Sequence, residues 1–432
     1  MNIHPTLLVL RSYFWFTPAL YGVISILFAI LTSILDHSVM INILTVDLSL
    51  AQTLLSTITS SLLTMTTISF STIMVVLTTY LSQFSPRTMQ DFLTDASTQR
   101  ILGVFIGGFL YSLVLLLLLK GDSADTLYIS PVLAVIYSII CVGYFVFFVH
   151  HVGRWIQVSN LIHHITNKTI ISINKNYEDE STDAGDEPWK DWESEEIKLI
   201  EPIYIFAPKA GYLLLIELEK LINQSKNDDS IVKIEVGLGD YIEEGTTVLS
   251  LWGKRDHLDI NHYLSFFHVG EERSTIQDID FGLTKLVEIT LRALSPGTND
   301  PNTAISGIRA LAKILTVLAG KNLHRSFYND DLNNLRVINK QRHFQDYLYK
   351  CYYQIRHYGI DDVSVVAAMI DSLQVIAAQN GTKTKKLIWE FSLYIQQGIK
   401  RETLLELDRD YLNEKIEQLS IQTKQGHSYR SL

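Results

Sequence analysis

Four oxygen-bearing side chains in the C-terminal half could bind a hard cation. Asp278, Asp280, Asn299 and Asp300 lie close together in the sequence, and carboxylate and amide oxygens are the ligands that Mg²⁺ and Ca²⁺ prefer. Ser295 opens a Ser-Pro-Gly turn, and the helix that follows could present free N–H groups to an anion. Asp300 as N-cap would occupy part of those donors and repel an anion. The alternative is a helix–turn–helix joint held by caps, and the residues do not specify a metal.

Motifs that signal catalysis are absent from the sequence. Ser295 lacks a G-x-S-x-G elbow, and the chain has neither a G-x-x-x-x-G-K-[ST] loop nor an H-E-x-x-H pair. His257, His262 and His268 are scattered through a loop-rich stretch, where only the fold could gather them for hydrolysis. The sequence implies no cofactor, and it favours a protein that is not an enzyme.

A stripe of hydroxyl residues lies within an apolar stretch. Ser60, Thr64, Thr67, Ser71 and Thr78 recur at spacings of three, four or seven, which places them on one face of a helix at about 100° per residue. Such hydroxyls could line a polar pore formed by an oligomer, or they could hydrogen-bond across tightly packed helices inside the monomer. More Ser and Thr lie off the stripe, and the span has no ionisable residue, so packing is the favoured interpretation.

The stripe lies in the second of four apolar stretches, which together make up most of the first third of the chain. Each is long enough to span a bilayer, which takes about 20 helical residues. They are Phe14–Leu35, Ile58–Leu81, Ile101–Leu119 and Ile129–Val149. Up to residue 150 we count 4 of the 36 Lys+Arg and 6 of the 46 Asp+Glu, which leaves 32 basic and 40 acidic residues for the remainder. A fully soluble enzyme is excluded, and two Cys exclude a disulfide-stapled secreted domain.

The loop charges predict the orientation of these helices. Arg87 and Arg100 lie in the second loop, Arg11 precedes the first helix and Arg154 follows the fourth. Because Lys and Arg concentrate on the cytoplasmic side, we expect a multi-pass protein of the inner (plasma) membrane with both termini in the cytoplasm. No charged residue lies within the four helices, which argues against an ion-coupled carrier. In the third helix, glycines at positions 103, 107 and 108 favour close helix packing.

The remaining chain predicts an α+β cytosolic part. After the membrane domain (1–155) we expect an amphipathic helix and an acidic linker (156–200), a small β module (201–255) and a helical bundle (256–432). The expected strands are Ile203–Phe206, Gly211–Leu218, Ser230–Val236 and Thr246–Leu251. The expected helices are Ile279–Leu294, Thr303–Leu318, Gln341–Tyr358, Asp361–Ala378, Lys383–Gln396 and Arg401–Leu419.

Glycine-rich turns in the β module resemble those of barrel-sandwich hybrid domains. The segments at 207–212 (Ala-Pro-Lys-Ala-Gly-Tyr) and 239–245 (Gly-Asp-Tyr-Ile-Glu-Glu-Gly) look like the turns of biotinyl carriers and membrane-fusion adaptors. No Met-Lys hairpin is present for attaching biotin or lipoate. We therefore expect a small barrel-sandwich-like module without a swinging-arm role.

Four motifs, taken in order, resemble one bacterial family over nearly the whole chain. They are Gln83-Phe84-Ser85-Pro86-Arg87, the Gly-rich run at 102–111, Gln277-Asp278-x-x-Phe281-Gly282, and Arg292-Ala293-Leu294-Ser295-Pro296-Gly297-Thr298-Asn299-Asp300-Pro301-x-Thr303-Ala304. The family is the predicted membrane proteins catalogued as domain of unknown function 2254. The resemblance implies the architecture and supplies no mechanism.

Three functions fit this architecture. The first is an oligomeric channel or permeation protein with a cytosolic regulatory domain. The second is a membrane-anchored sensor or scaffold whose cytosolic domain binds a ligand or a protein partner. The third is a membrane enzyme acting on a lipid or cell-wall precursor. The expected partners are the bilayer, further copies of the chain and an unspecified cytosolic ligand. Nucleic acid is disfavoured, because acids outnumber bases and no basic cluster is present.

Overall fold

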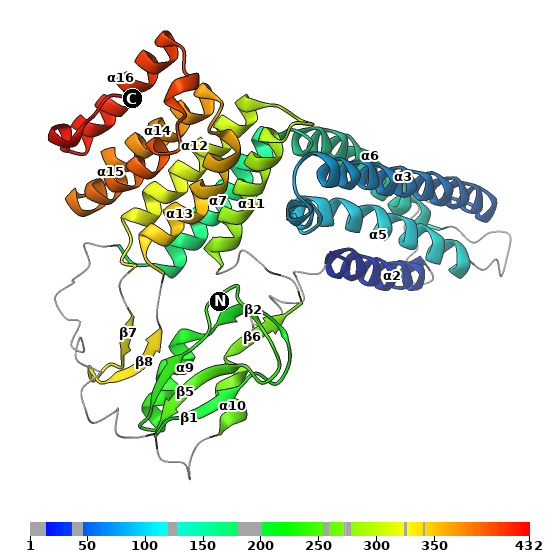
Figure 1. Ribbon diagram of the computed structural model, residues 1–432. Coiled ribbons are helices and arrows are strands. Elements are labelled where there is room, and N and C mark those ends of the chain that lie inside the picture. Colours follow the sequence, from blue (N-terminus) through cyan, green and yellow to red (C-terminus); the bar gives the residue numbers. More distant parts are fainter. Residues whose placement is uncertain are drawn as a thin grey trace. The chain divides into compact units, whose positions relative to one another are not determined.

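The chain divides into two compact units, Met1–Leu161 and Ile162–Leu432. The computed structural model describes residues 14–36, 46–119, 128–179, 201–253, 259–271, 273, 278–323, 326–339 and 342–432. Figure 1 shows an all-helical unit and a unit of helices and sheets. A helical N-terminal region followed by a mixed helix-and-sheet region matches the expected fold class. Most of the expected acidic linker lies outside the described residues.

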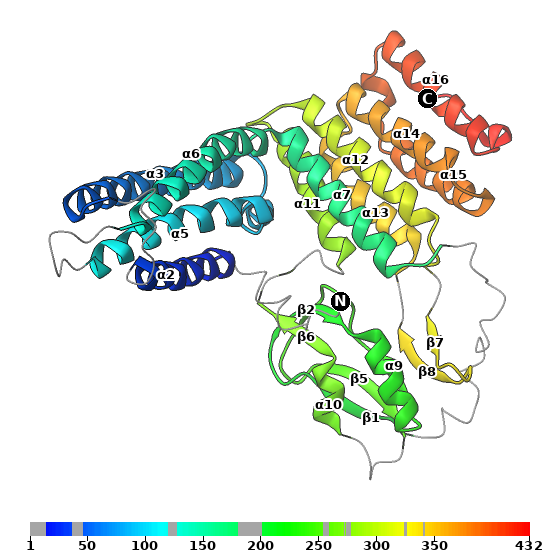
Figure 2. The same ribbon diagram turned by 180° about the vertical axis from the view of Figure 1, so that it is seen from behind.

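The first unit is a bundle of four long helices around α5. They are α2 (Phe16–Asp36), α3 (Leu48–Gln83), α5 (Ala96–Leu118) and α6 (Ser130–Trp155), with the short η1 (Pro86–Thr88) and α4 (Met89–Leu93) between α3 and α5. Helix α5 contacts the other three long helices, and Figure 2 shows them running side by side. All four expected apolar helices are therefore present.

Helix α3 begins ten residues earlier than the apolar pattern indicated. Its first turns mix polar and apolar residues, and the helix starts there because the Asp47 side chain accepts a hydrogen bond from the Leu50 N–H at 3.1 Å. An N-cap of this kind satisfies a backbone donor that the helix itself cannot. Residues 48–57, which were expected to form part of a loop, are therefore helical.

Five helices among the described residues are long and apolar enough to cross a membrane, one more than expected. Four are α2, α3, α5 and α6, and the fifth is α12 (Pro301–Ala319) in the second unit. Helix α12 buries one face against α11 (Ile279–Leu294) and α14 (Val363–Ala378). Length and composition alone do not separate a buried core helix from a span.

Two sheets enclose the core of the β region. The strands are β1 (Ile203–Phe206), β2 (Gly211–Ile216), β3 (Ile231–Ile234), β4 (Tyr241–Ile242), β5 (Thr247–Trp252), β6 (Phe267–Gly270), β7 (Phe327–Asn329) and β8 (Leu335–Asn339). One sheet has the order β1-β5-β3-β8-β7 and the other β4-β2-β6. All pairs are antiparallel except β3 with β8. Helix α9 (Leu218–Asn227) connects β2 to β3, and helix α10 (Ile260–Ser265) lies between β5 and β6 in the sequence.

Three of these strands correct the expectation that residues 256–432 are helical. Strand β6 pairs with β2, and β8 pairs in parallel with β3 about a hundred residues earlier. Figure 2 shows the yellow β7–β8 hairpin separated in sequence from the green strands. Short strands of three to five residues carry too little periodicity to stand out. These segments form strands because they pair with β2, with β3 and with each other.

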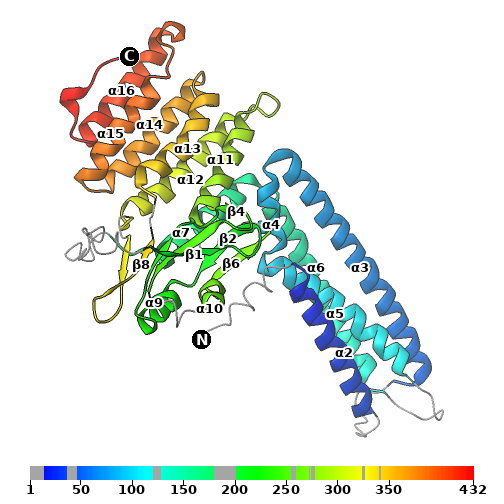
Figure 3. The same ribbon diagram turned by 60° about the horizontal axis from the view of Figure 1, so that its bottom comes forward.

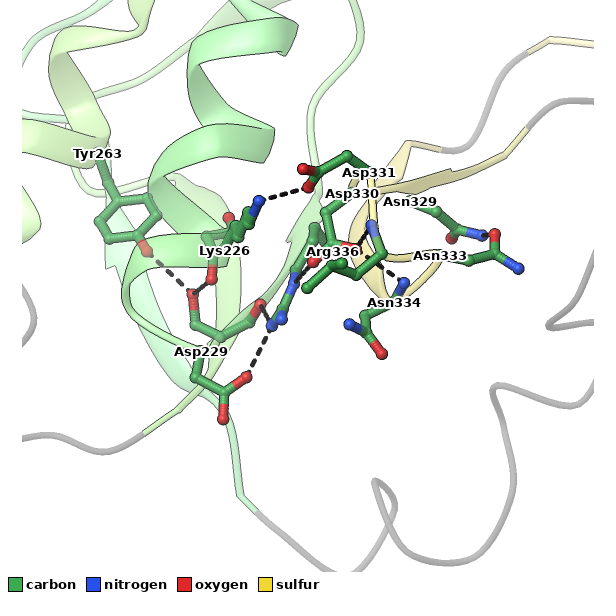
Figure 4. A network of polar contacts seen from close by, with 12 residues as sticks. Lys226, Asp229, Tyr263, Asn329, Asp330, Asp331, Asn333, Asn334 and Arg336 are labelled. Carbon is green, nitrogen blue, oxygen red and sulfur yellow. Dashed lines mark hydrogen bonds and ion pairs between the residues drawn. The ribbon is translucent and has the colours of Figure 1, made fainter.

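A buried arginine attaches the β7–β8 hairpin to the rest of the sheet (Figure 4). The Arg336 Nε donates to Asp330 Oδ2 at 2.8 Å, and a second guanidinium nitrogen donates to Asp229 Oδ1 at 2.9 Å. Asp330 also accepts from the Leu332 and Asn334 N–H groups, both at 2.9 Å, and so closes the turn. These hydrogen bonds and the Arg336 charge lower the pKa of the Asp330 carboxyl to about 2.

Among its described residues, the second unit also contains a bundle of seven helices. They are α7 (Val158–Asn176), α11, α12, α13 (Phe344–Gly359), α14, α15 (Thr382–Gln396) and α16 (Glu406–Gln422), with the one-turn helices η3 (Arg401–Thr403) and η4 (Gly426–Ser428). Figure 3 shows α14, α15 and α16 next to one another. The expected helices from Ile279 to Gln396 are confirmed with shifts of up to three residues, and the expected start at Gln341 lies outside the described residues. The last expected helix, Arg401–Leu419, is divided into η3 and α16, which begins at Glu406.

Candidate functional site

The hydroxyl stripe lies at the centre of the exposed face of α3. Ser60, Thr64, Thr67, Ser71 and Thr78 are all exposed. The buried α3 residues are Ala51, Leu55, Leu62, Ser69, Ile73, Val76 and Tyr80. At about 100° per residue, the buried set lies about 180° around the helix from the stripe. The favoured interpretation, packing inside the monomer, is therefore wrong, because the bundle contacts the opposite face of α3.

The threonines of the stripe bond to their own helix. Thr64, Thr67 and Thr78 each donate to the carbonyl four residues earlier, at 2.9 Å. This local bond satisfies the hydroxyl donor and leaves the oxygen on the surface. Exposed Leu63 and Met74 lie beside the stripe. The outer face of α3 thus carries a narrow polar line bordered by apolar side chains.

Glycines of α5 let its neighbours approach closely, as the small-residue spacing predicted. A Cβ at Gly107 would stand 2.6 Å from both the Ser25 Oγ and the Tyr137 hydroxyl. A Cβ at Gly103 would stand 2.8 Å from the Tyr21 ring. These glycines therefore leave the space in which the neighbouring helices pack against α5 at the centre of the bundle.

The Ser295–Asp300 turn is a compact joint between α11 and α12. Asp300 caps α12 by accepting from the Thr303 N–H at 3.1 Å and from its hydroxyl at 2.6 Å. Ser295 donates to the Arg292 carbonyl at 2.7 Å and accepts at its own carbonyl from the Asn299 N–H at 2.9 Å. Asn299 has a φ of 45°, in the left-handed region that Asn tolerates. Ser295 and Asp300 thus make hydrogen bonds within the turn and at the start of α12.

Asp278 lies at the opposite end of α11 from that turn. The helix has 16 residues, which corresponds to about 24 Å at 1.5 Å per residue. Asp278 and Asp280 therefore do not converge with Asn299 and Asp300. Among the described residues, no group of three or more His, Cys, Asp or Glu side chains could hold a metal ion.

The histidines considered for hydrolysis take separate roles. His268 lies on β6 and pairs with Glu217 at 2.8 Å. His262 lies on α10, with its ring centroid 4.9 Å from that of Phe266. His257 lies outside the described residues. The fold does not bring His262 and His268 into a shared constellation with a nucleophile.

A cluster of cations surrounds two buried carboxylates at the start of α11, and the sequence did not predict it. Arg273 pairs with Asp278 at 2.6 Å and with Asp280 at 3.2 Å. Asp280 also pairs with Arg342 at 2.9 Å and with Lys350 of α13. The cations come from two separate stretches of chain, residue 273 and residues 342–350, so only the fold assembles them. The two acids lie in the Asp-x-Asp spacing at 278–280, which was the one sequence signal of this cluster.

The cluster affects its two carboxyl groups differently. Burial raises the pKa of the Asp278 carboxyl above its usual value, although Arg273 opposes that shift. Burial acts in the same direction on Asp280, but Lys350, Arg342 and Arg273 together hold the pKa of that carboxyl below its usual value. Asp280 therefore stays ionised among its cations, as a structural charge needs to.

Residues around Asp278 explain one of the sequence motifs. The Asp278 side chain caps α11 by accepting from the Phe281 N–H at 3.0 Å. The Phe281 ring lies beneath two cations, with Lys285 Nζ 4.5 Å and the Arg273 guanidinium carbon 5.1 Å from its centroid. A Cβ at Gly282 would stand 2.1 Å from the Thr169 Oγ1 of α7. Each residue of the Asp-x-x-Phe-Gly element thus has a packing or capping role.

A family model described as "Predicted membrane protein (DUF2254)" matches residues 11–375. The chain belongs to this family. Two similar proteins are uncharacterized proteins of Mycobacterium tuberculosis and Mycobacterium bovis. Each is 26% identical over 370 residues, which covers 83% of this chain and 70% of the relative. No solved structure matches the chain.

Membership in DUF2254 confirms the resemblance read from the sequence motifs. The matched region spans the four apolar helices, the β region and the bundle as far as α14. It contains the α3 stripe, the charge cluster and the α11–α12 turn. Helices α15 and α16 lie beyond it.

Proposed function

We propose that this member of DUF2254 is an oligomeric permeation protein of the inner membrane. Helices α2, α3, α5 and α6 are its four spans, both termini are cytoplasmic, and the second unit is a cytosolic regulatory domain. The observation that carries the proposal is the hydroxyl stripe on the outer face of α3. One bundle cannot enclose an outward-facing stripe, but several copies related by a rotation axis can surround a pathway with it.

The chemistry of the stripe supports a passive pathway. The hydroxyl oxygens of Thr64 and Thr67 stay on the surface while their protons bond the helix, so they offer a polar wall without a fixed charge. Ionisable residues mark the relays of coupled transporters, and the four apolar stretches contain none. The proposed pathway therefore conducts down a gradient.

The burial of α12 supports a topology of four spans rather than five. Its buried residues include Ala304, Ile308, Leu311 and Leu315 on one face, and it carries Arg309 and Lys313 within its length. A helix with charged residues in its middle is costly to place in lipid. Helix α12 then remains in the cytosolic bundle.

Single-channel recording in planar bilayers tests the permeation proposal. Wild-type protein should show discrete openings that disappear in Thr67→Leu and Ser71→Leu. The matched control is Ser61→Leu, because Ser61 is also exposed on α3 but lies about 100° around the helix from Ser60. Openings that persist in both stripe variants, or a silent bilayer with folded wild-type protein, would reject the pathway and favour a membrane-anchored sensor or scaffold.

Thiol labelling provides a second test of the stripe. The native Cys141 and Cys351 are buried, so the background should be low. Under the proposal, a membrane-impermeant thiol reagent modifies Ser71→Cys and Thr67→Cys from the aqueous phase, whereas Ile68→Cys faces lipid and resists. Equal protection of all three thiols would contradict a water-filled pathway.

A further inference from the structure

A cavity of about 250 Å³ opens onto α5 in the first unit, and none of its lining residues belongs to the hydroxyl stripe. Four lining residues lie between positions 14 and 19, at the start of α2, and the others are Phe70 of α3 and Leu102 and Ile106 of α5. Helix α5 lies between α2 and α3 (Figure 1) and packs against both. We call this space the α5 cavity.

The α5 cavity has a buried floor, an exposed rim and an apolar lining. Pro18 and Leu102 are buried at its floor. Phe14, Trp15 and Phe70 are 42–51% exposed at its rim. All seven lining side chains are apolar or aromatic, and none carries a charge. On a membrane-spanning bundle, such a cavity takes up hydrocarbon rather than water.

Depth along α5 places the cavity beside the acyl chains of one leaflet. Leu102 and Ile106 lie about 9 and 15 Å along the helix axis from Ala96, the first residue of α5, at 1.5 Å per residue. The hydrocarbon core is about 30 Å thick, so with α5 as a span both residues lie in the half nearest its start. With the cytoplasmic termini proposed above, that half is the cytoplasmic leaflet.

A buried amide lies on the same face of α5 as the cavity. The Gln99 Oε1 accepts from the Thr17 hydroxyl at 2.7 Å, whereas the Gln99 Nε2 is buried without a hydrogen-bond partner among the described residues. Gln99 is only 4% exposed. Gln99, Leu102 and Ile106 are three and four residues apart and therefore share one helix face. A buried donor without an acceptor is costly, so Nε2 is suited to a ligand that brings an acceptor.

The acyl ester of a glycerophospholipid has both features that the site needs. Its chain is apolar, and its ester carbonyl accepts a hydrogen bond at the polar end of that chain. Gln99 lies about 4.5 Å from Ala96 along α5, nearer the membrane surface than Leu102. A free fatty acid would instead bring a carboxylate to a lining that has no cation, and burying an unpaired charge is costly.

We propose that the α5 cavity binds one acyl chain of a membrane glycerophospholipid. Leu102 and Ile106 contact the chain, and the Gln99 Nε2 donates to its ester carbonyl. The proposal rests on the membrane topology proposed above and not on permeation, because lipid binding is measured without flux.

Photo-crosslinking of the full-length protein in detergent micelles tests the site. The probe is a phosphatidylcholine with a diazirine on one acyl chain, and mass spectrometry locates the label. Ile139 and Val146 of α6 provide the internal reference, because they are 65% and 67% exposed and lie outside the lining. Labelling near Leu102 should exceed labelling near this pair about fivefold, because a bound chain stays longer than one that only solvates the surface.

Two variants fill the α5 cavity from different helices. Ile106→Trp should lower labelling near Leu102 about fivefold by occupying the space of the chain. Ala19→Phe should give a similar loss from an exposed position of α2, where a larger side chain does not disturb the bundle core. Ile139→Trp is the matched control on α6, and labelling near Leu102 should stay within about twofold of wild type.

Competition with unlabelled lipids tests the role of Gln99. Diester phosphatidylcholine should compete with the probe about threefold better than its diether analogue, as one hydrogen bond to the carbonyl would supply. Gln99→Leu should remove this preference while labelling near Leu102 persists. A preference that survives in Gln99→Leu would overturn the assignment of the amide to the ester.

Two further results would overturn the proposal. Equal labelling of α5 and α6, unchanged in Ile106→Trp, would mean that lipid only solvates the surface. A cavity that stays unlabelled while α6 is labelled would assign it to a second copy of the chain. Both results leave the recordings on Thr67→Leu and Ser71→Leu to decide permeation separately.

Discussion

Gly239 of the β region lies directly against the carboxylate of Asp278 at the start of α11. A Cβ at position 239 would stand 2.3 Å from the Asp278 Oδ2, and Gly239 has a φ of 80°. Arg273 pairs with that same carboxylate oxygen at 2.6 Å. Contact between the β region and the helical bundle thus depends on a residue without a side chain at this point.

Gly239→Ala should destabilise the second unit by about 3 kcal/mol, since a left-handed alanine costs about 1–2 kcal/mol and the displaced buried pair costs more. Gly245→Ala is the matched control, with a φ of 83° and nothing within 4 Å of the added Cβ. It should cost about 1 kcal/mol from backbone strain alone. Chemical unfolding of full-length protein in detergent measures both. Equal losses would show that the Asp278 contact contributes nothing.

Gly282→Ala should destabilise the packing of α7 on α11 by about 1–3 kcal/mol, because the added methyl meets the buried Thr169 hydroxyl. Thr169→Ala in the same chain should recover part of that loss, and a double-mutant cycle on unfolding free energies measures the coupling. Gly297→Ala, whose Cβ would meet nothing within 4 Å, should be nearly neutral. Additive losses in the cycle would contradict a direct contact.

Asp300→Ala should destabilise the protein by about 1 kcal/mol through loss of the α12 N-cap. If the Ser295–Asp300 turn is only a joint, millimolar Mg²⁺ or Ca²⁺ should leave the melting temperature of both wild type and variant unchanged. A rise in the wild-type melting temperature that Asp300→Ala removes would instead support a cation site at Asn299 and Asp300. Scanning fluorimetry with and without EDTA measures this.

Asp330 should make stability depend on acid pH. Its folded pKa of about 2 lies below the unfolded value of about 3.9, so its contribution is complete above the unfolded pKa and is lost as pH falls towards 2. The gap in melting temperature between wild type and Asp330→Asn should therefore shrink from pH 5 to pH 2.5. Asp331→Asn, on the same hairpin but with a 71% exposed side chain, should give a smaller gap throughout. A gap for Asp330→Asn that does not change with pH would be contrary to this linkage.

Local patterns were sufficient for much of the architecture. The helix Ile279–Leu294 was predicted to the residue, because an amphipathic run ends at Ser-Pro-Gly. Strand β1 was also predicted to the residue. The hairpin β7–β8 was missed within the expected helical bundle, since its strands are short and are held in place by Arg336 and by the pairing with β3.

The candidate sites depended more strongly on tertiary contacts. The spacing of Ser60, Thr64, Thr67, Ser71 and Thr78 predicted a stripe, but spacing alone cannot say which side of a helix its neighbours cover. The structure places α5 and α6 against the opposite face of α3. The sequence allowed Asp278 and Asp280 to bind a cation together with Asn299 and Asp300. Helix α11 separates the two pairs, because a helix of 16 residues holds its ends far apart.

The sequence by itself determined the four long apolar helices, the bundle helices and the family, because hydropathy, helix caps and motifs are properties of contiguous residues. Only the tertiary structure decided which face of α3 is exposed, that Gly239 meets Asp278, and that Arg273, Arg342 and Lys350 gather around Asp280. These contacts join segments distant along the chain, and their geometry follows from packing and charge pairing that no local pattern encodes.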